Sequence, residues 1–354
     1  MRTVERIWVI INPASGKSWG KKLQGGNPEQ YFWDIVKGSQ RSAEWLASLR
    51  IVFTQPTGPN TVANLARQAV EAGATRIVAG GGDGTFNQTI QVPGIVRRIP
   101  LAIVPFGSAN NLADNLGIPK DPRQAIALAL SERVAVRKID LGRVNDRYWF
   151  ANVASLGLDA KIIEKGTDLR TKSSRLRFVR NVSWGKVYCW LAGVGLVLGL
   201  HPRQCSEVDL RLDDWPLKTR IALINIGNGP RCGGAFKLNP NAKMDDGMLD
   251  MCLIESMGAL RAVQYAWRAL SGSHINLPGV ISCKVERLTV RCDQELSAEV
   301  DGEPLEPGHR FNIAVWREAL SVIVPPFPMT LATVPVSDQK VRLALSQSFS
   351  PEPA

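Results

Sequence analysis

The sequence predicts an α/β plus β fold, with an N-terminal α/β domain followed by a second domain that is mainly β. In the first part of the chain, short apolar runs alternate with helical patterns, and this alternation implies a parallel, layered sheet. From about Arg137 the apolar runs become closely spaced and are separated by turn residues, which is typical of antiparallel strands. The 354 residues also exceed the usual size of a single core, which favours two domains.

The strands expected in the first domain are apolar runs that end in polar or glycine-rich turns, with helices between them. One helix is predicted to begin after Pro59-Asn60. Another is predicted to begin at Asp121-Pro122, where the aspartate caps the helix and the proline occupies its first turn. The predicted strands cover residues 7–11, 51–53, 76–79 and 101–104.

The second domain is predicted to be a β-sandwich. It opens with a hairpin whose strands, 138–144 and 147–153, flank the turn residues Asn145-Asp146. We place the first domain at residues 1–136 and the second at 137–319, and we expect the Ser- and Pro-containing tail 336–354 to be partly disordered. Further strands are expected near 208–212, 221–226, 249–254, 288–290, 298–300 and 311–315.

The composition is that of an ordinary soluble protein. Apolar residues make up 45% of the chain, and no apolar run approaches the ~20 residues that span a bilayer. The first residues are typical of a strand and not of a signal peptide, so a cytoplasmic location is expected. The six cysteines contain no CxxC pair and only three histidines are present, which favours reduced structural thiols over a zinc site.

The net charge of +11 predicts an anionic partner, either nucleic acid, an acidic membrane surface or phosphorylated small molecules. Part of this charge is concentrated in residues 161–186, which hold eight Lys or Arg and are followed by the apolar stretch 187–200. The apolar residues fall roughly at helical spacing, so the segment has one apolar and one basic face. It could lie on an anionic membrane, or it could be a core helix with a solvated basic face.

A glycine-rich turn, Gly80 to Thr85, lies where a buried strand should become a helix. Glycine lets the backbone approach a ligand closely, and the amides that open a helix favour anions, so this turn suits phosphate. Asp83 lies inside it, and a carboxylate beside phosphates calls for a metal ion, a ligand hydroxyl or a transferring proton. A plain structural turn is the alternative.

Two further turns follow predicted strands in the same way. Gly16-Lys17-Ser18 is not a Walker A motif, because that motif needs a glycine at position 11 and the chain has Ile11. Residues 12–17 instead form a polar turn after the first strand, and residues 105–111 form another after the fourth. Since ligands bind at the carboxyl ends of strands in open α/β sheets, the three turns are expected to converge on one crevice.

Five motifs occur in a fixed order between about residues 7 and 325. They are Asn12-Pro13-Ala14-Ser15-Gly16, Gly81-Gly82-Asp83-Gly84-Thr85-Phe86-Asn87, Pro105-Phe106-Gly107-Ser108-Ala109-Asn110-Asn111-Leu112-Ala113, Asp245-Asp246-Gly247-Met248-Leu249-Asp250 and Asp301-Gly302-Glu303-Pro304. This set resembles the diacylglycerol kinase catalytic family, which includes bacterial lipid kinases and sphingosine kinases. The resemblance implies a first domain like that of NAD kinases and phosphofructokinases, a C-terminal β-sandwich, ATP in the cleft between them, and a segment 320–335 that returns to the first domain.

The resemblance implies which residues bind ATP, because residues at matching positions of the motifs are expected to have the same role. Three positions depart from the family pattern: Gln88 replaces a frequent Glu, Ser108 replaces Thr and Asn111 replaces Asp. The serine keeps a hydroxyl, whereas the loss of two carboxylates changes the local charge. The implied ATP-binding residues are Asn12, Ser15, Gly16, Thr54, Gly82, Asp83, Gly84, Thr85, Phe86, Asn87, Gln88, Ser108 and Asn110.

The resemblance also implies a metal site and a catalytic group. Mg²⁺ would be held by the carboxylate of Asp246 with the main-chain carbonyls of Lys243 and Met248, a set of oxygen ligands that suits this ion. Glu303 would accept the proton of the lipid hydroxyl, with Asp301 and Asp83 as further catalytic residues. Without the resemblance, Asp246 would be read as part of a turn and Asp301-Gly302 as a surface hairpin.

The resulting hypothesis is an ATP- and Mg²⁺-dependent kinase that phosphorylates a hydroxyl of a diacylglycerol-like or sphingoid lipid. It would lie in the cytoplasm and contact the inner face of the membrane transiently, and nucleic acid is not an expected partner. One alternative is an NAD kinase-like enzyme with a soluble substrate. Another is a non-catalytic lipid- or nucleotide-binding protein on the same scaffold. No motif addresses the oligomeric state.

Overall fold

The structure is a computed structural model. It describes residues 5–15, 28–38, 43–131, 135–161 and 206–326, apart from 56, 59, 159, 234–235 and 257. Gly16, the tail 336–354 and the basic and apolar segment beyond Lys161 therefore lie outside the described residues. Within those residues, no helix combines the length and the apolar character that crossing a membrane requires.

The first domain contains the predicted parallel sheet, in the order β4-β3-β1-β2. Strands β1, β3 and β4 are buried along their whole length, as expected for a sheet with helices on both faces, whereas the edge strand β2 is fully buried only at Leu49. The strands are β1 (Ile7–Ile11), β2 (Leu49–Phe53), β3 (Arg76–Gly81) and β4 (Leu101–Pro105), so all four predicted strands are confirmed.

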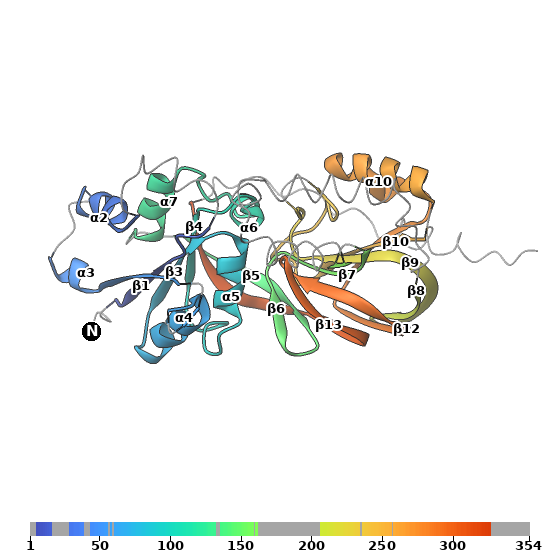
Figure 1. The fold of residues 1–354 in the computed structure, drawn as a ribbon, viewed down its shortest axis with the longest axis horizontal. Coiled ribbons are helices and arrows are strands. Elements are labelled where there is room, and N and C mark those ends of the chain that lie inside the picture. The colour runs from blue at the N-terminus through green and yellow to red at the C-terminus, as the bar shows by residue number, and fades with distance from the viewer. Residues whose placement is uncertain are drawn as a thin grey trace, which may run out of the picture.

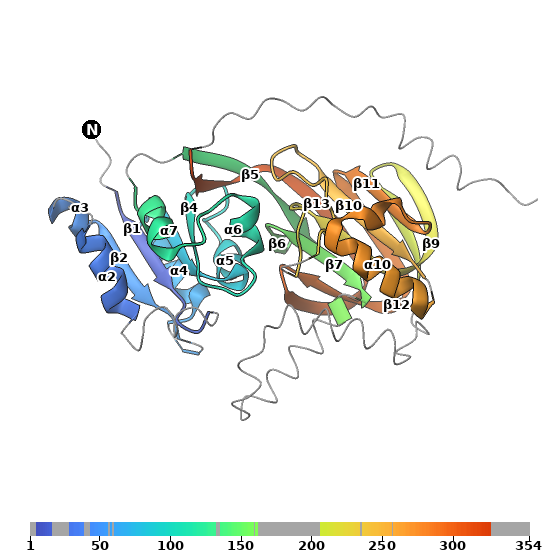
Figure 2. The ribbon, with the colours of Figure 1, turned by 90° about the horizontal axis from the view of Figure 1, so that it is seen from above.

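Helices cover both faces of this sheet: Figures 1 and 2 show α2 and α7 on one side and α4 and α5 on the other. The two helix starts predicted from the sequence are confirmed. Thr61 caps α4 through the amide of Asn64, and Asp121 caps α7 through the amide of Gln124. The helices are α2 (Pro28–Gly38), α3 (Ala43–Ala47), α4 (Val62–Glu71), α5 (Asp83–Ile90), α6 (Asn111–Asn115) and α7 (Pro122–Ala129).

The second domain is built from antiparallel strands, and the predicted opening hairpin is present with Asn145 and Asp146 at its turn. Sequence analysis did not predict α10 (Ala259–Ser271) and the short 3-10 helix η2 (Ser273–Asn276). The strands are β5 (Ala135–Val144), β6 (Tyr148–Phe150), β7 (Val153–Gly157), β8 (Ser206–Leu212), β9 (Trp215–Gly227), β10 (Leu249–Glu255), β11 (Val280–Val285), β12 (Arg287–Val300) and β13 (Glu303–Val324).

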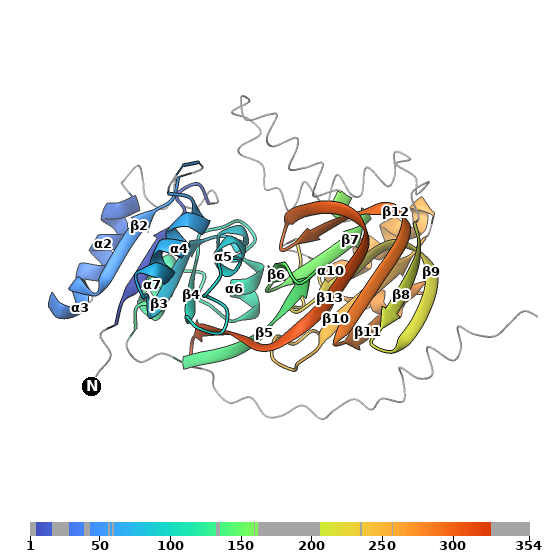
Figure 3. The same ribbon diagram turned by 90° about the horizontal axis from the view of Figure 1, so that it is seen from below.

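Two long strands, β5 and β13, join the domains, as Figure 3 shows. Strand β13 pairs with β12 at its start, and its Val322 pairs in parallel with Leu101 of β4. Strand β5 contributes Leu141 to the core of the first domain and Val144 to the core of the second. The described residues therefore form one hydrogen-bonded sheet that runs through both domains.

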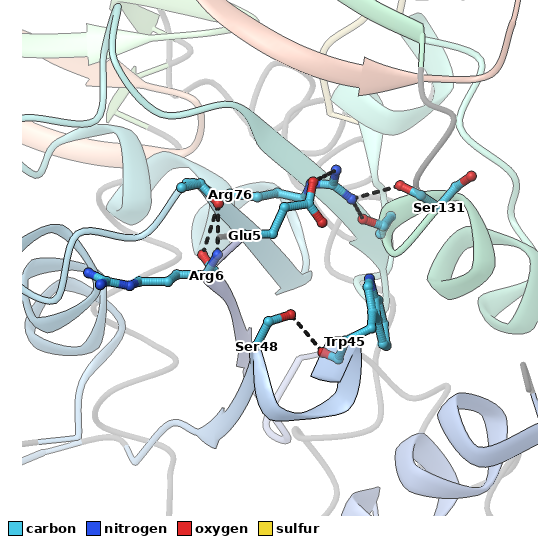
Figure 4. A network of polar contacts seen from close by, with 8 residues as sticks. Glu5, Arg6, Trp45, Ser48, Arg76 and Ser131 are labelled. Atoms are coloured by element: carbon cyan, nitrogen blue, oxygen red, sulfur yellow. Dashed lines mark hydrogen bonds and ion pairs between the residues drawn. The ribbon is translucent and has the colours of Figure 1, made fainter. Parts of the chain in front are cut away.

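A network around the buried Arg76 fixes the edge of the first domain opposite the predicted crevice (Figure 4). Its guanidinium donates to the carbonyls of Ala129 at 3.1 Å and Ser131 at 2.9 Å and pairs with Glu5 at 3.1 Å. The buried guanidinium thereby gains acceptors and an opposite charge, which a buried cation requires. These contacts anchor the start of β3. They therefore also help to fix the position of the glycine-rich turn that follows the other end of this strand.

Candidate active site

The three turns predicted to converge do meet at the carboxyl ends of β1, β3 and β4. Gly82 and Gly107 touch through their backbones, since a Cβ built on Gly107 would lie 2.5 Å from the Cα of Gly82. The hydroxyl of Thr85 in the second turn lies 3.3 Å from both Asn12 Nδ2 and Ser15 Oγ in the first. The glycines thus allow an approach that side chains would prevent.

The predicted ATP-binding residues fall into two groups. Gly82 precedes α5 with an extended backbone, Gly84 lies in its first turn, and Ser108 and Gln88 are exposed. Asn110 adopts a left-handed φ of 52° and donates to Gly107. These positions leave amides and polar side chains at the crevice, where the N-terminus of α5 favours an anion. Thr54 follows β2, and its amide donates to the carbonyl of Ile11 at the end of β1.

Phe86 and Asn87 differ from this picture because both side chains are buried, as is that of Thr85, whose hydroxyl contacts Asn12 and Ser15. Phe86 packs in the core of the first domain. The side chain of Asn87 points to the second domain, where its Nδ2 donates to Trp149 O at 3.2 Å and to Asp301 Oδ2 at 3.1 Å. A nucleotide could therefore reach these two residues only through their main chain.

The Asp83 carboxylate binds the amides that open α6. Its Oδ2 accepts from Asn111 N at 3.0 Å and its Oδ1 from Leu112 N at 3.1 Å, so it caps that helix from a distant position. Burial raises the pKa of Asp83 to about 6, against the opposing effect of these two amides. The sequence indicates a metal, a hydroxyl or a proton as the partner of Asp83, whereas the carboxylate binds the amides of the neighbouring turn.

Asp301 lies in the two-residue turn between β12 and β13, with Gly302, and both have the positive φ that a type I′ turn requires. Its carboxylate accepts from the amides of three consecutive residues, 151 to 153, at 2.8 to 2.9 Å, and from Asn87 Nδ2. Burial raises the pKa of Asp301, while these donors act in the opposite direction. The turn is therefore a hairpin that also joins the two domains.

Glu303 follows this turn directly and is exposed. Its Oε1 lies near Gly84, since a Cβ built on that glycine would be 3.2 Å from this oxygen. The second domain thus places a carboxylate beside the first turn of α5, where the phosphates of a nucleotide are expected. A side chain at position 84 would crowd that carboxylate.

Further polar contacts hold the domains in this arrangement. Gln91 at the end of α5 donates to Trp149 O at 2.8 Å and accepts from Trp149 N at 3.0 Å. Asn115 of α6 donates to Asn152 Oδ1 at 2.7 Å. Sequence analysis missed these residues, because a single polar residue near a helix end gives no signal of its partner.

The turn predicted to hold Mg²⁺ is anchored by another residue that sequence analysis missed. The buried Asp140 accepts from the amides of Gly247 and Glu318, each at 2.7 Å, and its own amide donates to Met244 O at 2.6 Å. A carboxylate between the apolar residues Ile139 and Leu141 was the available signal. The turn is thus fixed to β5, the strand that links the domains.

The Asp246 carboxylate faces a cation, the ammonium of Lys284, which also lies 3.5 Å from Asp250 Oδ2. Burial raises the pKa of Asp250 to about 6, against the opposing effect of the Lys284 ammonium. Two carboxylates therefore converge on one cation position, which fits a metal ion if the partly exposed Lys284 moves aside. Within the described ranges, no group of three or more His, Cys, Asp or Glu side chains could hold a metal on its own.

The model of the diacylglycerol kinase catalytic domain matches residues 6–144, and the model of the YegS C-terminal NAD kinase beta sandwich-like domain matches residues 152–324. A protein of Chromohalobacter salexigens named "Probable lipid kinase YegS-like" is 32% identical over 90% of this chain and 93% of its own length. The chain belongs to the diacylglycerol kinase family of lipid kinases. The predicted fold class, with its NAD kinase-like parts, is thereby confirmed.

Other relatives agree with this assignment. The diacylglycerol kinase of Bacillus subtilis is 27% identical over 88% of this chain and 94% of its own length. A crystal structure of a diacylglycerol kinase from Bacillus anthracis has a TM-score of 0.62 at 19% identity, over 92% of this chain and 99% of that chain, which shows a shared fold. The family is thus a kinase family, whereas the roles of the individual site residues remain predictions.

The pKa of Asp83 predicts a dependence of stability on pH. The pKa is 3.8 for an ordinary aspartate and about 6 for Asp83 in the folded protein. At pH values between these two, the folded state therefore binds more protons than the unfolded state. The contribution of this group to the free energy of unfolding is therefore fully present below the lower value and is lost as the pH rises through the higher one. In urea denaturation, the difference in unfolding free energy between wild type and Asp83→Asn should fall as the pH rises from about 4 to about 6. A difference that is constant over this range would contradict the assignment.

Proposed function

We propose that this chain is an ATP-dependent lipid kinase that transfers the γ-phosphate to a hydroxyl of a diacylglycerol-like or sphingoid lipid. The observation that carries the proposal is the position of Glu303, whose carboxylate lies beside Gly84 at the start of α5. A general base and a phosphate-binding turn come from different domains and meet at one place. Family membership supports the reaction class.

In the proposed reaction, the amides of the turns around Gly82 and Gly107 bind the phosphates, assisted by the positive end of the α5 dipole. Glu303 accepts the proton of the lipid hydroxyl as that oxygen attacks the γ-phosphorus. The bond from phosphorus to the bridging oxygen breaks, and ADP leaves with the electron pair. Positioning and charge neutralisation supply most of the rate in such transfers, so one carboxylate base is sufficient.

Asp301 and Asp83 act in this proposal as positioning residues. Asp301 holds the turn that presents Glu303, and Asp83 holds the turn that carries Ser108 to α5. The family departure at Asn111 fits this arrangement, because its side-chain amide lies 3.4 Å from Asp83 Oδ2 and can donate to it. An aspartate at position 111 would place a second carboxylate against the first.

Mg²⁺ would be held by Asp246 with the carbonyls of Lys243 and Met248, in the turn that Asp140 anchors. When bound, it would replace the ammonium of Lys284 as the counter-charge of this turn, and a separate Mg²⁺ would accompany ATP. The lipid substrate implies transient contact with the inner face of the membrane by a cytoplasmic protein. A kinase of a soluble substrate and a non-catalytic binding protein are the alternatives that the experiments must exclude.

A direct assay tests the proposed activity. Purified protein is incubated with radiolabelled ATP, Mg²⁺ and mixed micelles that hold diacylglycerol, ceramide, sphingosine or monoacylglycerol, with soluble NAD as a control. Label is expected in the lipid phase with at least one of the four lipids. Label in NAD alone would identify a kinase of soluble substrate, and ATP binding without any transfer would favour a non-catalytic protein.

The variant Glu303→Gln tests the proposed base. Because the amide cannot accept the proton, turnover is expected to fall by about 10²-fold or more while ATP affinity stays within about twofold. Glu306→Gln is the matched control, since Glu306 is an exposed glutamate on the same strand. Turnover in Glu303→Gln equal to that of the control would eliminate the base assignment.

The variant Lys284→Met tests the cation position. Removing the ammonium leaves Asp246 and Asp250 without their counter-charge, so the affinity for Mg²⁺ is expected to rise by about tenfold, and Asp246→Asn should abolish this binding. Isothermal titration with Mg²⁺ in the absence of ATP measures the effect. Lys218→Met, which removes a lysine paired with Glu207, is the control. Equal Mg²⁺ affinity in wild type and Lys284→Met would refute competition between the lysine and the metal.

A further inference from the structure

The outer face of α10 carries an apolar strip. Trp267 is 77% exposed, and Val263 and Leu270 are each 41% exposed. Their spacing of four and three residues places all three within about 60° of one another around the helix axis. Among the described residues, only Val136 and Trp215 are other large hydrophobic residues with such exposure. Apolar surface that gathers on one helix indicates an interaction surface.

The strip is not an unfinished part of the core, because the opposite face of α10 is already packed. Tyr265 and Ala269 are buried, and Tyr265 packs with Cys252 and Ile254 of β10. The Tyr265 hydroxyl donates to Pro278 O. The helix is therefore packed on the sheet by this face, and Figure 1 shows α10 above the strands. The strip lies on the exposed side of the helix.

The charge of α10 selects the kind of partner. Arg261 and Arg268 are exposed and lie seven residues apart, so they share one flank of the helix, about 100° or more around the axis from the apolar strip and next to the face that packs on the sheet. The helix contains no Asp or Glu, and neither arginine pairs with an acidic side chain within the described ranges. A helix with Trp and aliphatic residues on one flank and arginine on the other fits the interface of an anionic bilayer.

We propose that the apolar strip of α10, formed by Val263, Trp267 and Leu270, docks on the surface of an anionic phospholipid bilayer, with Arg261 and Arg268 on the helix flank reaching toward its anionic headgroups. Its C-terminal end is tied to the segment before the predicted metal turn, since Lys237 N donates to Ala269 O at 2.8 Å. Docking there brings the second domain to the membrane that holds the substrate. The role given to this surface, bringing the enzyme to its substrate, rests on the proposed lipid kinase activity. The observations that identify the surface do not depend on that activity.

Vesicle sedimentation tests the surface without any catalytic step. Wild type is expected to bind vesicles that contain phosphatidylglycerol, and Trp267→Ser to bind with about tenfold lower affinity. Arg261→Gln with Arg268→Gln should weaken binding to anionic vesicles by a similar factor. Trp215→Ser is the matched control, because Trp215 is 72% exposed but follows Asp213 and Asp214. Val263→Ser with Leu270→Ser repeats the test if Trp267→Ser does not fold by circular dichroism.

The outcomes separate the surface from the activity. Equal vesicle binding by wild type, Trp267→Ser and the second apolar variant would overturn the proposal, even if lipid is phosphorylated. A change of oligomeric state in Trp267→Ser with vesicle binding intact would also overturn it and identify a protein interface. Binding that depends on Trp267 without phosphorylation of any lipid would leave the surface standing and refute the kinase. With active protein, Trp267→Ser should lose turnover on vesicle-held lipid and keep it on a dispersed short-chain substrate.

Discussion

The arrangement of the two domains depends on one turn, the Asp301-Gly302 pair between β12 and β13. The Asp301 carboxylate accepts from three consecutive backbone amides of its own domain and from Asn87 of the first domain. Each amide would otherwise lack a partner in a partly buried place, and an unsatisfied buried donor costs about 1–3 kcal/mol. The same turn starts the strand that begins with Glu303. The position of the proposed base is therefore determined by the interaction that holds the domains together.

Three aspartates, one buried and two half-buried, share this way of acting. Asp83, Asp140 and Asp301 each bind backbone amides of a neighbouring turn rather than facing open solvent. A carboxylate accepts several hydrogen bonds at once, and such bonds offset the cost of burying its charge. Turns that must hold phosphates or a metal cannot rely on regular secondary structure for rigidity. The carboxylates provide that rigidity, which leaves Glu303 as the exposed carboxylate beside the turn proposed to bind phosphate.

The sequence predicted the strands of the first domain and the helix starts at Thr61 and Asp121 well, because these depend on local apolar patterns and caps. It also identified which turns would meet, since parallel strands present their carboxyl ends at one edge. The partners of the aspartates were not predictable, because the amides that bind Asp83 lie 28 and 29 residues away along the chain. Asn87 was assigned to ATP from its place in a motif, whereas its side chain binds the other domain, a contact with a residue 214 positions away.

Helix α10, which carries the exposed strip, was missed because strands were expected on both sides, although its residues divide clearly into a more apolar and a more polar face. That same strip forms the proposed membrane-docking surface. Its end is hydrogen-bonded to Lys237, and the loop that leads there begins at Gly229, whose amide donates to Asn152 O at 3.0 Å. The amide of Asn152 in turn donates to Asp301. The proposed membrane surface and the turn of the proposed base thus belong to one packed domain, so docking would orient the site without a change of its internal geometry.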